Sequence, residues 1–363
     1  MTFLSYPSKL CVLQHMEANQ RILLGLHCPS LRIAEKSVPL KIHYLKIEDQ
    51  ILNINHVKYS VFVIGRDSTN DVEPNGLGDF DKNGVRVDRW ESQFPKCPDE
   101  LYKEYCGPHD EEVENEHFYA ENNRHVILLT VKFENSRRTE RVAYTKYVYD
   151  AMKYLVWKIF DGRGPIFTER YSFFCDGLLR FPINFKLRPR HLGIIDAYDG
   201  DLDVLLSFLD TATFPLESLF INMNDPIDIS SLPAKFVEIS CYWPDLNLDE
   251  ITHSNVHILR YIPTSEDIFQ MIETWMQRGK KVGTVFKFNC ESLKTVKELF
   301  KEIQAIEETE VLYKQREVSE PLLATIPMND ETNVEVLCGY DEEDGGLKSI
   351  TVEVKARNKE STH

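Results

Sequence analysis

One short stretch of the chain has the spacing of a calcium-binding loop. Asp79, Asp81, Asn83 and Gly84 follow the pattern D-x-D-x-N-G, which supplies oxygen ligands at positions one, three and five and a tight-turn glycine at position six. The twelfth position, where such a loop needs a bidentate carboxylate, is Trp90, and the sequence signals no helices on either side. We therefore expect a solvated turn, and calcium binding measured by calorimetry would reverse that expectation.

A second group of residues offers zinc ligands in an acidic stretch of the chain. These are Cys97, Cys106, His109 and His117. Structural zinc sites usually bring ligands in pairs two to four residues apart, and only Cys106 and His109 meet that spacing. We expect an exposed acidic loop with incidental cysteine and histidine, and the sequence predicts no bound metal and no cofactor.

Four aspartates follow an apolar run and could hold a cation or act as acid and base. They are Asp196, Asp199, Asp201 and Asp203. Aspartates in this position more often form a turn and a helix N-terminus, where their charge complements the helix dipole. The chain also lacks the G-x-S-x-G, G-x-x-x-x-G-K, H-E-x-x-H and G-x-G-x-x-G motifs. We predict a protein that is not an enzyme and keep a cation-dependent enzyme as the weakest alternative.

A short basic stretch contrasts with the charge of the whole chain. Lys186, Arg188 and Arg190 precede a predicted strand and could bind an acidic target, although a solvated loop is the simpler interpretation. The chain of 363 residues has 42 Lys and Arg against 58 Asp and Glu, so its formal net charge is −16. This charge repels phosphate backbones and anionic bilayers, so we expect neither nucleic acid nor membrane as a partner.

The eight cysteines are spread without a CxxC pair, and no apolar run approaches the ~18 residues of a membrane span. We expect a protein of a reducing compartment, cytoplasmic or nuclear. At roughly 100–200 residues per domain, the length predicts two or three packed units.

The elements that position these residues follow from apolar periodicity. Helical spacing predicts short helices in residues 1–39, with Asn19 as a cap of the second. Residues 40–146 alternate with a period of two and are β-rich, except for an acidic insertion at 65–122 that we expect to be mobile.

Residues 147–356 begin with an amphipathic helix and then repeat a short apolar strand. The strand markers Ile194, Ile221, Ile239, Ile258 and Phe286 are 27, 18, 19 and 28 residues apart. Strands and helices alternating at ~20–29 residues characterise leucine-rich-repeat solenoids, so we expect an irregular array of this kind with a terminal hairpin. Residues 357–363 are a tail. The predicted fold class is α+β.

The N-terminal segment resembles the F-box, in which a Leu-Pro start and spaced leucines present an apolar surface to the Skp-type adaptor of cullin-RING ubiquitin ligases. The residues that carry the resemblance are Leu4, Pro7, Leu10, Leu13, Ile22, Leu24, Leu26 and Leu31. With residues 28–32, 38–42, 179–182 and 214–216, the chain resembles the nematode-expanded F-box C type family and its associated domain of unknown function.

This resemblance implies a substrate-recognition subunit of a Skp-cullin-F-box ubiquitin ligase. The N-terminal helices would bind the Skp-type adaptor, and the C-terminal domain would bind a target protein that the sequence does not identify. Helical periodicity leaves open which of the apolar residues face the adaptor and which pack inward. The main alternative is a non-enzymatic interaction scaffold whose N-terminal helices only cap their own domain.

Overall fold

The computed structural model describes most of the chain outside residues 65–125. The described ranges are 5–48, 50–64, 79–80, 86–87, 126–133, 136–142, 148–174, 181–195, 201–222, 229–240, 246–260, 263–290, 292–314, 320–340 and 347–357. Two compact units are present. The first comprises residues 1–190 and 195–213, and the second comprises residues 191–194 and 214–363.

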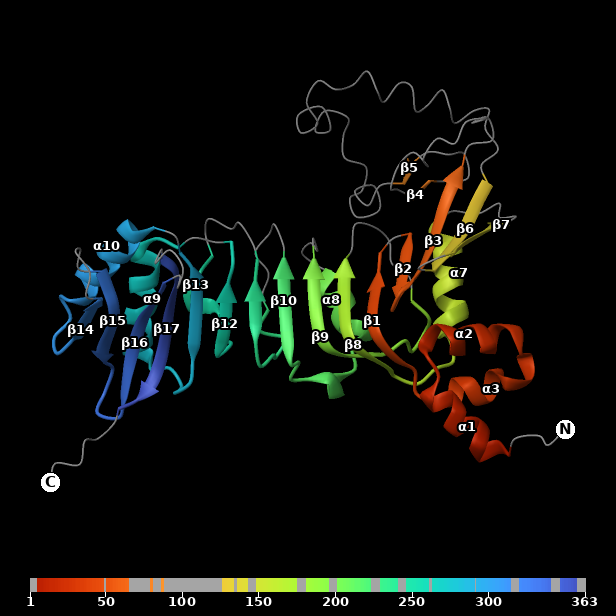
Figure 1. Cartoon of the computed structure of the whole chain (residues 1–363), viewed down its shortest axis with the longest axis horizontal. Coiled ribbons are helices and arrows are strands. Elements are labelled where there is room, and N and C mark those ends of the chain that lie inside the picture. The colour runs from red at the N-terminus through yellow and green to blue at the C-terminus, as the bar shows by residue number, and fades with distance from the viewer. Residues whose placement is uncertain are drawn as a thin grey trace, which may run out of the picture. The chain divides into compact units, whose positions relative to one another are not determined.

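The first unit begins with three helices, α1 (Tyr6–His15), α2 (Ala18–His27) and α3 (Pro29–Ser37) (Figure 1). Proline in the first turn suits α1 and α3 because the missing N–H would be unpaired there anyway. Glu17 caps α2 by accepting hydrogen bonds from the backbone N–H of Asn19 and Gln20. The predicted cap, Asn19, instead lies inside α2.

Seven strands of the first unit follow the order β9-β8-β1-β2-β3-β6-β7. β1 runs parallel to β8, and the pairs from β1 to β7 in this order are antiparallel, as the alternating apolar pattern predicts. The strands are β1 (Lys41–Ile47), β2 (Ile51–Ile54), β3 (Val57–Ile64), β6 (Val126–Phe133), β7 (Ser136–Val142), β8 (Ile166–Phe174) and β9 (Leu187–Ile195), the last shared by both units.

Further elements of the first unit are α7 (Val148–Phe160), α8 (Asp201–Phe208), the 3-10 helix η1 (Thr211–Thr213) and a two-stranded ladder of β4 (Asp79–Phe80) and β5 (Arg86–Val87). The ladder contains the only described residues of the predicted insertion at 65–122. α7 packs against β3, and Met152, Val156 and Ile159, which share one face of the helix, are buried.

The second unit continues with four parallel strands and a β-meander. β10, β11, β12 and β13 are parallel neighbours, and β17, β16, β15 and β14 then pair antiparallel outward from β13. Their bounds are β10 (Ser218–Asn222), β11 (Val237–Ile239), β12 (Asn255–Ile258), β13 (Val285–Asn289), β14 (Glu310–Lys314), β15 (Glu320–Pro327), β16 (Thr332–Tyr340) and β17 (Leu347–Ala356).

Helices of the second unit are α9 (Ser265–Arg278), α10 (Leu293–Ile303) and the 3-10 helix η2 (Leu248–Glu250). Trp275 of α9 packs edge-on against Phe286 of β13, with ring centroids 5.1 Å apart, and α10 contacts β15. Thr264 and Asp267 form a capping box, and Gly279 ends α9 with a positive φ of 75°. Ser292 caps α10, because its side chain accepts a hydrogen bond from the backbone N–H of Thr295.

The combination of N-terminal helices with a large mixed sheet confirms the predicted fold class. The predicted short strands are present and pair in parallel, and the predicted hairpin is formed by β16 and β17. The hairpin does not end the sheet, because β15 and β14 extend it further. Among the described helices, none combines the length and the apolar character that crossing a membrane requires.

Candidate functional site

The three N-terminal helices are short, so they need tertiary contacts to be stable. A small apolar cluster supplies part of this. Leu13 of α1 packs with Ala34 of α3 and with Val38, and Leu10, Met16 and Leu24 lie partly buried around them. Of the residues that resemble the F-box, Leu13 therefore packs inward. Ile22 is also buried.

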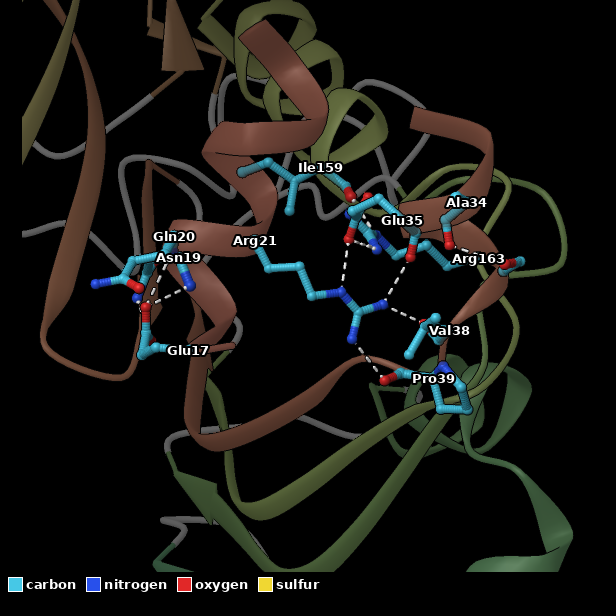
Figure 2. A network of polar contacts seen from close by, with 11 residues as sticks. Glu17, Asn19, Gln20, Arg21, Ala34, Glu35, Val38, Pro39, Ile159 and Arg163 are labelled. Atoms are coloured by element: carbon cyan, nitrogen blue, oxygen red, sulfur yellow. Dashed lines mark hydrogen bonds and ion pairs between the residues drawn. The ribbon is translucent and has the colours of Figure 1, made fainter. Parts of the chain in front are cut away.

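A buried network of charges supplies the rest. Arg21, Glu35 and Arg163 have side chains only 2%, 1% and 4% exposed. Arg163 forms two hydrogen bonds to the Glu35 carboxylate, of 2.6 Å to Oε1 and 2.7 Å to Oε2, while Arg21 Nε donates to Oε1 at 2.9 Å (Figure 2). One carboxylate thus bridges two guanidinium groups, with geometry that favours charge-assisted hydrogen bonds.

The remaining donors of Arg21 are used by the backbone at the end of α3. Its terminal nitrogens donate to the carbonyl oxygens of Glu35, Val38 and Pro39, the first at 2.7 Å and the last at 2.8 Å (Figure 2). The Glu35 carbonyl also accepts from the Val38 backbone N–H at 3.4 Å, and Val38 and Pro39 follow the last residue of α3, where the helix supplies no further donors. Burial lowers the pKa of Arg21, and the charge of Glu35 opposes that shift.

Arg163 brings α7 into the same network. Gly162, with a positive φ of 70°, turns the chain after α7, and Arg163 Nε donates back to the Ile159 carbonyl at 2.8 Å. Lys36 of α3 donates to the carbonyl of Asp161 in this turn. The C-terminal end of α7 is therefore tied to α3, across more than 120 residues of sequence.

Gly25 leaves the space that the network needs. A Cβ atom at this position of α2 would lie 2.9 Å from Glu35 Oε2, closer than real Cβ contacts allow. The Glu35 carboxylate could not move away from such a Cβ atom without breaking its hydrogen bonds to Arg163. A glycine inside a helix costs about 1 kcal/mol relative to alanine, so the close approach of Glu35 gives a physical reason for its presence.

A second polar cluster fixes α2 on the sheet. Asn19 Nδ2 donates to the Ile54 carbonyl at 2.9 Å, and the Tyr59 hydroxyl donates to Asn19 Oδ1 at 3.1 Å. Glu17 accepts from Asn55 Nδ2 at 2.6 Å. Desolvation, with the nearby Glu17 charge, raises the pKa of Tyr59 to about 12. The start of α2 is thus attached to β2, to the turn after it and to β3.

The outward side of this helical unit is apolar in places. α1 buries only Leu13 and leaves Tyr6, Pro7 and Val12 exposed. On α3 the exposed positions are Pro29, Ser30, Ile33 and Ser37, a spacing that marks one helix face, and Ile33 is 84% exposed. The residues predicted from sequence to bind an adaptor did not include Tyr6, Val12 or Ile33. Exposed apolar side chains on helices are typical of protein–protein docking faces.

The other residues of the F-box resemblance occupy intermediate positions. Leu10, Leu24, Leu26 and Leu31 are partly buried, so they border the interior and the surface. Leu4 lies outside the described residues. The structure thus distributes the described residues of this set between the core of the helical unit (Leu13 and Ile22), its rim, and the exposed surface (Pro7).

The basic residues predicted to bind a target do gather on one side of their strand. Lys186, Arg188 and Arg190 alternate with buried Leu187 and Pro189. Each has a partner. Arg188 Nε donates to Asp210 at 2.8 Å and its guanidinium lies over the Phe167 ring, Arg190 donates to Glu169 at 3.2 Å, and Lys186 donates to the Ser207 carbonyl at 2.8 Å.

Most of the metal candidates lie outside the described residues, including Asp81, Asn83, Gly84, Cys97, Cys106, His109, His117, Asp196 and Asp199. Asp79 begins β4, Asp201 begins α8, and the Asp203 side chain is exposed. Within the described ranges, no three His, Cys, Asp or Glu side chains gather closely enough to hold a metal ion.

Comparison with known families identifies a domain in the middle of the chain. Residues 147–292 match the family described as "Domain of unknown function (DUF3557)". This domain contains Arg163 and the strands from β8 to β13, whereas Arg21 and Glu35 precede it. The match does not name the F-box family. No curated protein and no solved structure matches the chain.

Proposed function

We propose that this protein is a substrate-recognition subunit of a Skp-cullin-F-box ubiquitin ligase, whose N-terminal helices bind the Skp-type adaptor. The observation that carries the proposal is the exposure of Tyr6 and Val12 on α1 and of Ile33 on α3. α1 gains little from its own domain, since it buries one side chain. An adaptor covering these residues would bury apolar surface that the isolated chain leaves in water.

The attachment of the helices also supports this role. A ligase receptor must hold its target at a defined position relative to its adaptor. The pairs of Glu35 with Arg21 and Arg163 join the proposed adaptor-binding helices to the domain at residues 147–292. A rigid connection of this kind would keep the adaptor-binding side and the neighbouring domain in fixed register.

We assign target binding to the basic residues Lys186, Arg188 and Arg190. The ion pairs of Arg188 and Arg190 are partly or largely solvent-exposed, and such pairs contribute little stability. An acidic segment of a target could therefore replace Asp210 or Glu169 at small cost. Arg188 would keep its stacking on Phe167 during this exchange.

Adaptor binding is tested by calorimetry with the purified Skp-type adaptor and the full chain. The variant with Val12→Asp and Ile33→Asp changes two exposed side chains and spares buried Leu13. We expect it to lower the affinity at least about tenfold, because charge is placed where apolar contacts would form.

The matched control carries Val282→Asp and Ile183→Asp, the same residue changes at exposed positions outside the helices. It should bind like the wild type. Absence of binding by the folded wild type would refute the ligase proposal and leave the interaction scaffold, with helices that only cap their domain, as the better interpretation.

A further inference from the structure

β14 forms an open edge of the second unit. It is the terminal strand in the order β14-β15-β16-β17-β13, and among the described strands only β15 pairs with it. Within the part of the chain that the structure describes, the other edge of β14 therefore offers backbone N–H and C=O groups to a further strand. Such edges are templates for association with another chain unless they are covered.

A row of leucines leads to this edge. Leu312 of β14 stands opposite Leu323 of β15, which stands opposite Leu337 of β16. Residues directly opposite each other on neighbouring strands share a face of the sheet. Leu312 is 59% exposed and Leu337 45% exposed, so the row is largely open to solvent.

The row lies on the side of the sheet away from α10. The next residue, Tyr313, has its hydroxyl hydrogen-bonded to Gln304 at the end of α10. The pairing of β14 with β15 is irregular between Leu312 and Tyr313, so the face of Leu312 is taken from its partner Leu323. Ala324, the next residue of β15, is fully buried, so Leu323 and Leu312 lie on the opposite, outward face of the sheet. No described helix covers these leucines, and three of them in line are more apolar surface than scattered exposure accounts for.

The sequence of β14 is complementary to itself. Its five residues are Glu310, Val311, Leu312, Tyr313 and Lys314. If a second copy of the strand pairs antiparallel about a two-fold axis at Leu312, then Glu310 of each copy comes opposite Lys314 of the other, and Val311 comes opposite Tyr313. The symmetry produces each favourable cross-strand pair twice.

We propose that two copies of this chain associate through antiparallel pairing of their β14 strands, centred on Leu312. The pairing gives hydrogen-bond partners to the backbone N–H and C=O groups on the outer edge of both β14 strands. It also joins the two leucine rows into one, with Leu312 of each copy side by side at the centre. The interface is isologous, so it closes on itself and stops at the dimer.

The first test measures the mass of the full chain by sedimentation equilibrium over a range of concentrations. We expect a reversible shift from 42.3 kDa towards twice that mass. A chain that stays at 42.3 kDa throughout would overturn the proposal.

Charge exchange then identifies the strand and its register. Glu310→Lys alone and Lys314→Glu alone each place like charges opposite each other twice, and each should raise the dimer dissociation constant about tenfold. The double exchange should restore wild-type association. Glu298→Lys on the exposed side of α10 is the matched control and should have no effect. If the dimer dissociation constant is unchanged by the single charge exchanges on β14, the dimer uses another surface and the proposal fails.

Cross-linking tests the two-fold centre. Residues directly opposite in an antiparallel pair have Cα atoms roughly 4.5–5.5 Å apart, within disulfide range. Oxidation of the Leu312→Cys variant should yield a covalent dimer. The Val282→Cys variant, whose cysteine replaces a similarly exposed side chain, should not. Equal cross-linking of the two variants would show random collision and contradict the register.

Discussion

The N-terminal helices of the first unit and the helices of the second unit are fixed by different physical means. In the first unit, α2 and α3 are held mainly by buried charges and amides, with Glu35 between Arg21 and Arg163 at the centre. In the second, α9 and α10 are held by apolar stripes. These stripes are Ile268, Met271, Ile272 and Trp275 on α9, and Val296, Leu299, Phe300 and Ile303 on α10.

The difference predicts how strongly each set of helices responds to a single substitution. An apolar stripe stabilises the fold through the apolar area and volume that it buries. A buried side chain in it can therefore be replaced by another of similar size at small cost. A bidentate pair requires donors and acceptors at fixed positions, and a buried charge without its partner is costly. The first unit therefore depends more strongly on single residues, and it holds its helices in one arrangement.

The strongest test of this contrast is Glu35→Gln. The change keeps the shape of the side chain but leaves two buried guanidinium groups without a carboxylate. We expect the free energy of unfolding to fall by about 3–5 kcal/mol. Urea unfolding followed by circular dichroism measures it, and hydrogen exchange should show the loss first in residues 5–39.

The control for this change is Glu298→Gln on α10, where the carboxylate is half exposed in a pair with Lys294. It should alter the free energy of unfolding by less than about 0.5 kcal/mol. If Glu35→Gln cost no more than the control, the buried network would not be what holds the helices.

Alkaline pH offers a second and smaller test of the first unit. The pKa of Tyr59 is raised from 10.0 to about 12, so the folded state favours the neutral phenol. This contribution is complete below pH 10 and is lost as pH rises towards about 12. The expected loss is about 2–3 kcal/mol.

Tyr59→Phe separates this effect from other tyrosines. The variant should be less stable at pH 7 by about 1 kcal/mol, because the hydrogen bond to Asn19 is lost. It should also lose less stability than the wild type between pH 10 and pH 12. Parallel curves for the two proteins would mean that Tyr59 does not titrate with the unfolding.

The smallest expected effect belongs to the second unit. Thr264→Ala removes the capping box of α9 but leaves its apolar stripe intact, so the loss should be about 1 kcal/mol. The same unfolding experiment measures it. Thr274→Ala inside α9 loses a hydrogen bond to Asp249 without touching the cap, and it serves as the comparison. If Thr264→Ala lowered the free energy of unfolding by nearly as much as Glu35→Gln, the contrast between the two sets of helices would be wrong.

Local signals predicted most helices and many strands. α7, α9 and α10 have clear apolar periodicity and caps or terminal glycines, and β10 to β13 are short apolar runs. The strands β8, β14 and β15 were not predicted. The alternation of β8 breaks at Glu169 and Arg170, β14 is short with charged ends, and Pro321 near the start of β15 argues against a strand.

The candidate site was less accessible to sequence reasoning. Among the described residues selected by the F-box resemblance, Pro7 is exposed and the others are buried or partly buried. The exposed apolar residues Tyr6, Val12 and Ile33 are not in that set. Arg21 and Glu35 have ordinary helical positions, and Arg163 follows 128 residues after Glu35. No local pattern connects residues so far apart in sequence.

The sequence by itself determined the fold class, the periodic helices and strands, and the acidic character of the chain. Tertiary structure alone decided which apolar side chains of the first helices face outward, which charges are buried, and which strand ends the sheet. The physical reason is that periodicity and capping act over one or two turns, whereas burial and ion pairing depend on what the folded chain brings alongside.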